Sequence, residues 1–395
     1  MNTAEIADMQ KNYLIPTYAP ERALVKGAGT KVWDAEGNEY LDFLAGIAVL
    51  NVGHCHPNVV KAIQEQAAKL MHVSNLYYNE VQPQLAKKLS GIAGGGKCFF
   101  CNSGAEANEG LIKLARLWGS DKGKFEVITM KNSFHGRTLA TLTATGQEKV
   151  QKGFAPLPAG FIHAEFNNLD SVKEAVTDKT AAILVEAVQG EGGVVPADPE
   201  FLTGLRELCD EQDLLLFFDE VQTGVGRTGH WFGFQNVDVQ PDAFSLAKAL
   251  GNGFPIGAIV AAPKVADIFQ PGNHATTFGG TPLACAAALA VLETIEQEKL
   301  LENASAMGAL LLDRLQTIAA RYDWIEGARG IGLMAGLVLN DSALPLQKLL
   351  EKKGLLTLAT AVKVLRMLPP LTVTTEEIER AAVLIAEACK EINEY

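Results

Sequence analysis

Short apolar runs alternate with amphipathic stretches through the middle of the chain. KFEVITM, AAILVEA and LLLFFDE have the length and composition of buried strands. The stretch FLTGLRELCDEQD between the last two has helical spacing, and AEANEGLIKLARLW follows the strand-like run KCFFCNSG in the same way. Because strands that alternate with helices pair in parallel, this pattern predicts an α/β fold with helices on both faces of a mainly parallel sheet.

The pattern changes towards both ends of the chain. Residues 1–20 indicate an irregular arm, whereas the turn residues D-A-E-G-N within residues 31–50 predict a hairpin. From about residue 282 there follow a long helical region, a strand in GIGLMAGLVLN, a helix in LPLQKLLEKKG, a short strand and a last helix in TTEEIERAAVLIAEACKEI. We therefore expect an N-terminal segment that forms part of a smaller α+β domain, a large domain, and a C-terminal portion of the smaller domain, at residues 1–52, 53–284 and 285–395.

Composition limits the partners and the compartment. The chain has 395 residues and a formal net charge of -12, a field that repels nucleic-acid phosphates and anionic lipids. Neither nucleic acid nor membrane is therefore expected as a partner. No run of 18 apolar residues exists, and the start MNTAEIADMQKNY lacks the basic and apolar regions of a signal peptide, so we expect a cytoplasmic protein.

Three short patterns resemble sites for other ligands. Cys98 and Cys101 form a C-x-x-C pattern, but a buried strand points them to opposite faces, which indicates core thiols. The glycine-rich runs at 91–98 and 224–229 lack the hydroxyl residue or the following helix that phosphate and dinucleotide loops need. The adjacent residues of the H-C-H triplet cannot all face one ion, so no metal site is expected.

Two charged residues stand beside apolar runs. Lys248 follows such a run in AFSLAKALGNGFPIGA, and a buried lysine is costly unless its pKa falls or it is bound covalently. A surface lysine that extends into water is the alternative. Asp219 ends LLLFFDE, and ligands of parallel sheets bind beyond such strand ends. A carboxylate there could equally cap a loop amide.

Two loop regions add further candidates. Residues 102–105 lie where a strand runs into a helix, and a helix start offers free N–H groups to a phosphate. Ser103 and Glu106 also fit a capping box, which does not exclude the phosphate. In NSFHGRT, Phe134 offers a ring face and Arg137 a planar cation for a carboxylate, although this segment could be a simple loop.

Together these residues match the requirements of amino-group chemistry on pyridoxal phosphate. This cofactor needs a lysine that binds its aldehyde, a carboxylate that keeps its ring nitrogen protonated, backbone donors for its phosphate and a group against its ring face. Lys248, Asp219, residues 102–105 and Phe134 supply one candidate each.

The sequence resembles the class III, fold-type-I aminotransferases nearly from end to end. The resemblance lies in VWDAEGNEYLDF, FCNSGAEANE, FHGRT, VQGEGGV, FDEVQTGVGRTG, LAKALGNGFPIGA, TTFGG and LRMLPPL. It implies the pyridoxal-phosphate transferase fold and a homodimer with shared active sites. It assigns catalysis to Lys248 and Asp219. Cofactor contacts fall on Ser103, Gly104, Ala105, Phe134, Asp219, Val221, Gln222, Lys248 and, reaching into the partner's site, Thr277; substrate contacts fall on Arg137, Glu191, Thr276 and Arg366.

The resemblance also implies substrates. LDFLAGIAVLNVGHCHP and SNLYYNE resemble members that transfer the terminal amino group of N2-acetyl-L-ornithine to 2-oxoglutarate, in arginine biosynthesis. Glu191 would pair with Arg366 in the first half-reaction and release it to the second substrate; a purely structural ion pair is the alternative. Three other activities stay open: transfer from ornithine, succinyldiaminopimelate or 4-aminobutyrate, decarboxylation or amino-group migration on the same fold, and non-catalytic binding of the cofactor by a regulator.

Overall fold

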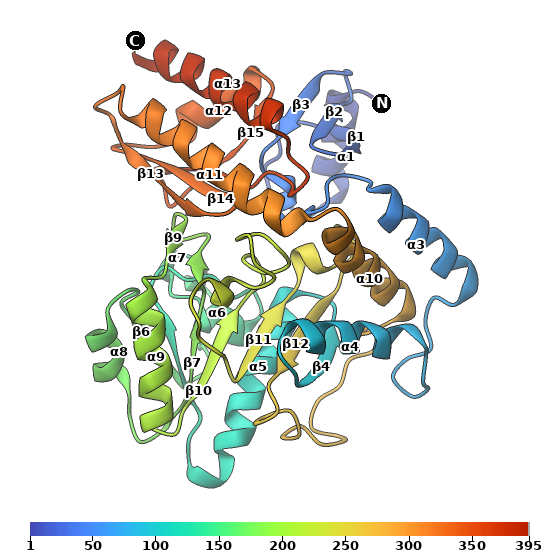
Figure 1. The fold of residues 1–395 in the computed structure, drawn as a ribbon, viewed down its shortest axis with the longest axis vertical. Coiled ribbons are helices and arrows are strands. Elements are labelled where there is room, and N and C mark those ends of the chain that lie inside the picture. The colour runs from blue at the N-terminus through green and yellow to red at the C-terminus, as the bar shows by residue number, and fades with distance from the viewer. Residues whose placement is uncertain (394–395) are drawn as a thin grey trace.

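A seven-stranded sheet forms the centre of the molecule in the computed structural model, which describes residues 1–393 (Figure 1). The strand order is β4-β12-β11-β10-β7-β5-β6, and the pairs within β11-β10-β7-β5-β6 are parallel, which confirms the predicted mainly parallel sheet. The strands are β4 (Lys97–Cys101), β5 (Glu126–Met130), β6 (Phe161–Ala164), β7 (Thr180–Val185), β10 (Leu215–Asp219), β11 (Ala243–Leu246) and β12 (Gly257–Ala261).

Strand β12 runs antiparallel to both of its neighbours, β11 and β4. Residues 247–256 join β11 to β12. A parallel return requires a crossover of about a dozen residues or more, so this short connection can only bring the chain back in the opposite direction. Lys248 is the second residue of this connection and therefore lies just beyond the end of β11.

The two faces of the central sheet pack against different helices. On β10, Leu215 and Phe217 pack in the cluster that includes α5, whereas Leu216 and Phe218 pack in the cluster that includes α9. Successive strand residues point to opposite faces, so an uninterrupted apolar run is what a strand covered on both sides requires. The helices around the sheet are α3 (Pro57–Lys69), α4 (Val81–Ile92), α5 (Gly104–Gly119), α6 (Leu139–Ala144), α7 (Glu148–Gln151), α8 (Leu169–Ala175), α9 (Pro199–Glu211) and α10 (Pro282–Gln297).

The N-terminal strands join a strand from the far end of the sequence. The predicted hairpin is confirmed as β2 (Lys31–Asp34) and β3 (Glu39–Asp42), which pair antiparallel, and β1 (Leu24–Ala28) extends their sheet. Strand β3 pairs in parallel with β15 (Leu355–Leu356). Figure 1 accordingly shows the N-terminal strands beside the C-terminal helices. This pairing supports the predicted domain division, whose boundaries remain a prediction.

The prediction of an irregular arm at residues 1–20 is partly wrong, because Thr3–Tyr13 form helix α1. The side chain of Asn2 accepts a hydrogen bond from the Glu5 backbone N–H at 2.9 Å, and the Glu5 carboxylate accepts one from the Asn2 N–H at 3.1 Å. This reciprocal capping box satisfies two free donors at the start of the helix. The N-T-A-E sequence carried the signal, but the helix buries no residue and so lacks an apolar stripe.

Two further expectations for the C-terminal region need correction. The long helical region is divided into α10 and α11 (Leu300–Ala319) at Lys299, whose φ is 54°. The single strand expected in GIGLMAGLVLN is part of a hairpin of β13 (Ile325–Ile331) and β14 (Met334–Leu339). Gly332, with φ of 55°, allows this tight reversal. The remaining elements include α2 (Ala45–Ala48), β8 (Val188–Gln189), β9 (Val195–Pro196), α12 (Leu344–Lys352), β16 (Leu358–Thr360), β17 (Val364–Met367) and α13 (Thr375–Asn393).

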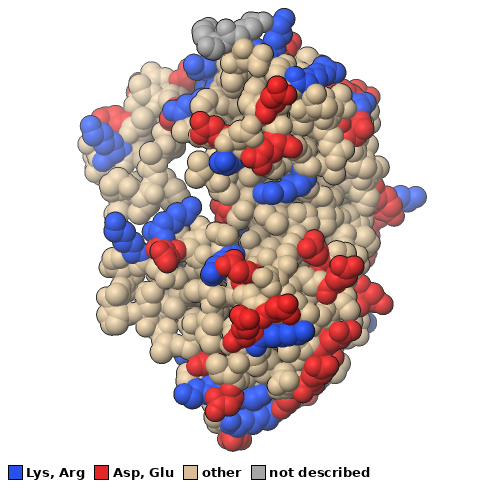
Figure 2. All heavy atoms as spheres, turned by 90° about the vertical axis from the view of Figure 1, so that its left-hand side faces the viewer, with Lys and Arg blue, Asp and Glu red and all other residues tan. Residues whose placement is uncertain are grey.

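Cysteines and surface charge agree with a reduced, globular protein. Cys98 and Cys101 are free thiols, and burial raises the pKa of each to about 12. Cys101 is a core thiol as predicted, whereas Cys98 is half-buried and packs against the core. Acidic and basic side chains are interspersed over the face that Figure 2 shows. Within residues 1–393, no helix has the length and apolar character needed to cross a membrane.

Candidate active site

A cavity of about 370 Å³ lies beyond the C-terminal ends of β10 and β11. Its position is the usual ligand site of an α/β sheet, and its size is within the range of small-molecule pockets. Most of the residues predicted from the sequence line it: Ser103, Gly104, Ala105, Phe134, Arg137, Glu191, Asp219, Val221, Gln222 and Lys248.

Lys248 enters the cavity from an unusual backbone conformation. It is the first residue of a short 3-10 turn directly after β11, and its φ is 42°, a left-handed value that is rare for residues with a side chain. Burial, and then the positive charge of Arg366, lower the pKa of Lys248 below its ordinary value. A neutral amine is the form that can attack an aldehyde or accept a proton.

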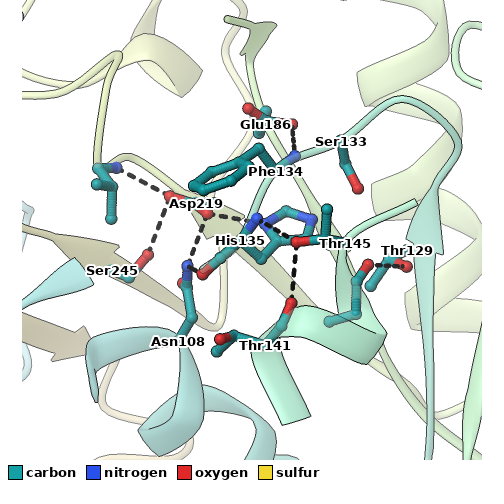
Figure 3. A network of polar contacts seen from close by, with 12 residues as sticks. Asn108, Thr129, Ser133, Phe134, His135, Thr141, Thr145, Glu186, Asp219 and Ser245 are labelled. Carbon is teal, nitrogen blue, oxygen red and sulfur yellow. Dashed lines mark hydrogen bonds and ion pairs between the residues drawn. The ribbon is translucent and has the colours of Figure 1, made fainter. Parts of the chain in front are cut away.

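Asp219 lies at the end of β10, where four donors surround its carboxylate (Figure 3). Oδ2 accepts from Asn108 Nδ2 at 2.7 Å and from His135 Nδ1 at 2.8 Å. Oδ1 accepts from the Val221 N–H at 3.0 Å and from Ser245 Oγ at 3.4 Å. These hydrogen bonds fix the orientation of the buried carboxylate.

Helix α5 begins where the phosphate site was predicted. The Ser103 hydroxyl accepts from the Glu106 N–H at 3.2 Å, while the Glu106 carboxylate accepts from the Asn102 N–H at 2.6 Å. The predicted capping box is thus only half formed, because Glu106 binds Asn102 rather than Ser103. A Cβ added to Gly104 would lie 2.8 Å from Val221 Cγ1, so this position requires glycine.

The loop after β5 carries Phe134 and Arg137. The Phe134 N–H donates to Glu186 Oε2 at 3.2 Å, and the Arg137 guanidinium lies 5.5 Å from the centre of the Phe134 ring. Burial, and then the charge of Asp219, raise the pKa of Glu186 well above its ordinary value. Through this hydrogen bond the buried Glu186 holds the loop that carries Phe134.

An ion pair closes one wall of the cavity. Arg366 Nη1 on β17 lies 2.6 Å from Glu191 Oε1 and 3.3 Å from Gln222 Oε1. The Arg366 side chain is fully buried, yet its Nε and Nη2 have no hydrogen-bond partner among the described residues. The Glu191 side chain is 31% exposed. Buried donors without partners are rare, and two on one guanidinium leave capacity for a carboxylate.

Three predicted site residues do not line the cavity: Thr276, Thr277 and Arg366. Thr276 Oγ1 accepts from Asn102 Nδ2 and from the Gly279 N–H, each at 3.2 Å, so it contacts a residue of the cavity wall. Thr277 is exposed and does not line the cavity of its own chain. A single chain therefore brings together all the predicted residues except these three, of which the buried Arg366 reaches the wall through Glu191 and Gln222.

Four polar residues of the site were not predicted from the sequence: Asn108, His135, Glu186 and Ser245. Asn108 lies in the mixed helical stretch AEANEGL and His135 in the loop NSFHGRT, and neither interrupts an apolar run. Glu186, by contrast, follows the apolar run AAILV, and Ser245 interrupts AFSL. Such a residue must find a buried partner, and this was the available signal.

The arrangement fits the cofactor predicted from the sequence. A helix start suits the phosphate, the Asp219 carboxylate suits a protonated ring nitrogen, Phe134 offers a ring face, and Lys248 offers an amine of lowered pKa. Arg366 does not line the cavity itself, but its partner Glu191 lines the wall and is partly exposed.

Comparisons with known proteins agree with this geometry. The model of the family Aminotransferase class-III matches residues 16–389. The chain is 52% identical to the acetylornithine aminotransferase of Caldanaerobacter subterraneus subsp. tengcongensis, over 97% of this chain and 98% of that one. Two solved structures are similar. The acetylornithine aminotransferase of Elizabethkingia anophelis has a TM-score of 0.89 at 33% identity and covers 99% of this chain and 100% of that one. An ornithine aminotransferase from Toxoplasma gondii, with partial occupancy of PLP at its active site, has a TM-score of 0.95 at 34% identity and covers 99% and 95%.

Proposed function

The chain belongs to the class-III aminotransferases, and from this premise we propose that it transfers the terminal amino group of N2-acetyl-L-ornithine to 2-oxoglutarate. The products are N-acetyl-L-glutamate 5-semialdehyde and L-glutamate, and the step belongs to arginine biosynthesis in the cytoplasm. The donor is supported by 52% identity over nearly the whole chain to a protein of that name. The observation that carries the two-substrate reaction is the buried Arg366, paired with Glu191 and left with free donors.

The family uses pyridoxal phosphate, as predicted from the sequence. When bound, this cofactor supplies an electron sink for the bond that must lose a proton. The N–H groups of Gly104 and Ala105 would hold its phosphate, Asp219 would keep its ring nitrogen protonated, and Phe134, Val221 and Gln222 would contact its ring. Thr277 of one subunit completes the phosphate site of the other.

Lys248 carries the cofactor and then moves the proton. Burial, and then the charge of Arg366, lower the pKa of its amine, which favours the neutral form in which Nζ can accept a proton from the substrate carbon. The protonated Nζ then donates the proton to the reacting carbon of the cofactor. A lowered pKa is what this double role requires, because the amine must gain and lose the proton within one cycle.

Three charged residues select the substrates. Arg137 binds the carboxylate that both substrates carry far from the reacting carbon. Glu191 covers Arg366 while the amine donor is bound, because that donor has no carboxylate beside its reacting carbon. When 2-oxoglutarate binds, Glu191 turns away and the Arg366 Nη1 that it releases binds the adjacent carboxylate. Glu191 has the exposure needed for this movement.

A panel of amine donors tests the proposed substrate. Glutamate formation from 2-oxoglutarate is measured with N2-acetyl-L-ornithine, L-ornithine, succinyldiaminopimelate and 4-aminobutyrate. We expect kcat/KM to be highest for acetylornithine, by about tenfold or more over ornithine. A higher value for ornithine, the substrate named for the Toxoplasma gondii relative, would replace the proposal with that activity. A regulator without catalysis would leave the cofactor absorbance unchanged when a donor is added.

Mixed subunits test the shared active sites. Lys248→Ala subunits lack the amine in their own site. Thr277→Ala subunits lack the contact that they would make in the partner's site. In a mixed dimer both defects therefore fall in one site, and the other site is intact. We expect about half of the wild-type activity per mixed dimer, from mass action on one intact site. If tagged mixed dimers form and remain inactive, Thr277 does not serve the partner's site.

A further inference from the structure

We propose that Asn108 is a positioning residue that fixes the ring-nitrogen carboxylate, Asp219, relative to the phosphate-binding start of helix α5. The inference rests on the proposed pairing of Asp219 with the cofactor. It adds a residue that the family resemblance did not assign.

The contacts of Asn108 define the direction of its amide. Nδ2 lies 2.7 Å from Asp219 Oδ2 and 2.8 Å from the His135 carbonyl oxygen. An NH₂ group has two hydrogens, and here each meets one acceptor. The opposite orientation would place the amide oxygen against a carboxylate and a carbonyl. The chemistry of the neighbours therefore settles the orientation, and Nδ2 donates both bonds.

The position of Asn108 on the helix links two ends of the site. Gly104 and Asn108 are four residues apart on α5, so they lie on one face with a rise of about 6 Å between them. The first residue belongs to the proposed phosphate site, and the second contacts Asp219 (Figure 3). Because one rigid helix carries both, the spacing between phosphate site and carboxylate is fixed by α5.

The same amide also fixes which carboxylate oxygen remains available. Oδ2 of Asp219 receives the two short side-chain hydrogen bonds, from Asn108 and His135. Oδ1 has one backbone donor and the long 3.4 Å contact with Ser245. The oxygen with capacity for another donor is therefore Oδ1. Asn108 and His135 hold the carboxylate so that Oδ1 is the atom presented to the ring nitrogen.

Neutrality at position 108 matters as much as geometry. Asn108 is 1% exposed, so a charge there would have little solvent to screen it. Asn108→Asp keeps the shape but sets a second carboxylate beside Asp219. Two buried carboxylates at hydrogen-bond distance cannot both ionise, and they share one proton. The variant should therefore bind cofactor well only at low pH, when the shared proton restores a donor to Asp219.

The experiment measures cofactor binding rather than turnover. Fluorescence titration of apo-protein with pyridoxal phosphate, from pH 6 to pH 9, gives the dissociation constant of wild type, Asn108→Asp, Asn108→Ala and Asn51→Asp. For Asn108→Asp we expect affinity to fall at least about tenfold further than wild type as the pH rises. For Asn108→Ala, which loses one donor to a charged group, we expect an affinity about tenfold weaker with the pH profile of the wild type.

Asn51→Asp is the matched control. Asn51 is also fully buried, but its side chain bonds to Val225 O and to Arg227, away from the cavity. We expect wild-type affinity and pH profile for this variant. If Asn108→Asp binds cofactor with the wild-type profile, or Asn108→Ala binds with wild-type affinity, the inference is wrong. Neither measurement uses an amine donor, so failure here is distinct from a wrong substrate.

Discussion

Replacing Arg366 by methionine should impair one half of the reaction and leave the other nearly intact. The substitution keeps an unbranched side chain of similar length in β17 and removes the guanidinium. In the proposed cycle the guanidinium is paired with Glu191 while the amine donor reacts, and it binds substrate only when 2-oxoglutarate enters.

The structure sets the size of the effect. Arg366 is fully buried, so its bond to a substrate carboxylate is poorly screened, and loss of one partner of such a pair costs about 3–5 kcal/mol. That range corresponds to a loss of roughly 150- to 5,000-fold in the oxoacid half-reaction. The amine half-reaction should change by less than about threefold, since Glu191 is partly exposed and can turn to water when its partner is absent.

Single-turnover kinetics separate the two halves. Enzyme is mixed in a stopped-flow instrument with acetylornithine alone, or is first loaded with an amino group and then mixed with 2-oxoglutarate, and the cofactor absorbance is followed. Arg366→Lys is an informative companion, because it keeps the charge but loses the planar fork. It should recover only part of the oxoacid rate.

Arg329→Met is the control for a structural effect on the same region. Arg329 on β13 donates from Nε and Nη2 to the carbonyl of Gly193, in the turn that carries Glu191. A change in that turn should alter both halves alike. If Arg366→Met slows both half-reactions equally, as Arg329→Met would, then the Glu191–Arg366 pair is structural and the proposed exchange of partners is wrong.

Two other outcomes follow from the structure. Lys248→Ala should retain its fold but lose turnover by at least about 10⁴-fold, since it removes both the attachment point and the proton carrier. After borohydride reduction and denaturation, the cofactor should remain with the wild-type chain and separate from the variant. Retention in both would exclude Lys248 as the attachment point. In the native protein, Cys55 alone should react rapidly with a thiol reagent at pH 8, because it is exposed, whereas burial raises the pKa of each of the other thiols to about 12; six thiols should react after denaturation, and several fast thiols in the native state would contradict the burial.

The sequence predicted those parts of the fold that depend on buried runs. Strands such as Leu215–Asp219 are apolar on both faces, and the motif residues at their ends came together as expected. Helix α1 was missed because it buries nothing, and the hairpin around Gly332 was missed because β13 is mostly polar or glycine and only its end lies in the apolar run that forms β14. The periodicity of apolar residues reports which residues are buried. It therefore gives no signal for an element that buries nothing, and it does not separate two elements within one apolar stretch.

The residues of the site also fall into those that the sequence indicates and those that it does not. Residues with a chemical role of their own, such as Lys248 and Asp219, could be found from their type and position. Asn108 and His135 act only through Asp219, and their sequence separations from it, 111 and 84 residues, carry no local signal. Thr277 is a third case, since its proposed contact lies on another subunit and cannot be seen in one chain.

The pairing of β3 with β15 has a consequence for the order of synthesis. Leu41 lies beside Leu355, so the first strands of the chain leave the ribosome roughly 300 residues before their parallel neighbour exists. At about 5–20 residues per second this wait lasts roughly 15 to 60 seconds. The central sheet, complete by Ala261, can form during that interval, whereas β3 keeps an unpaired edge. An mRNA truncated before codon 355 would therefore release a chain with an open strand edge, a ready substrate for chaperones and for aggregation.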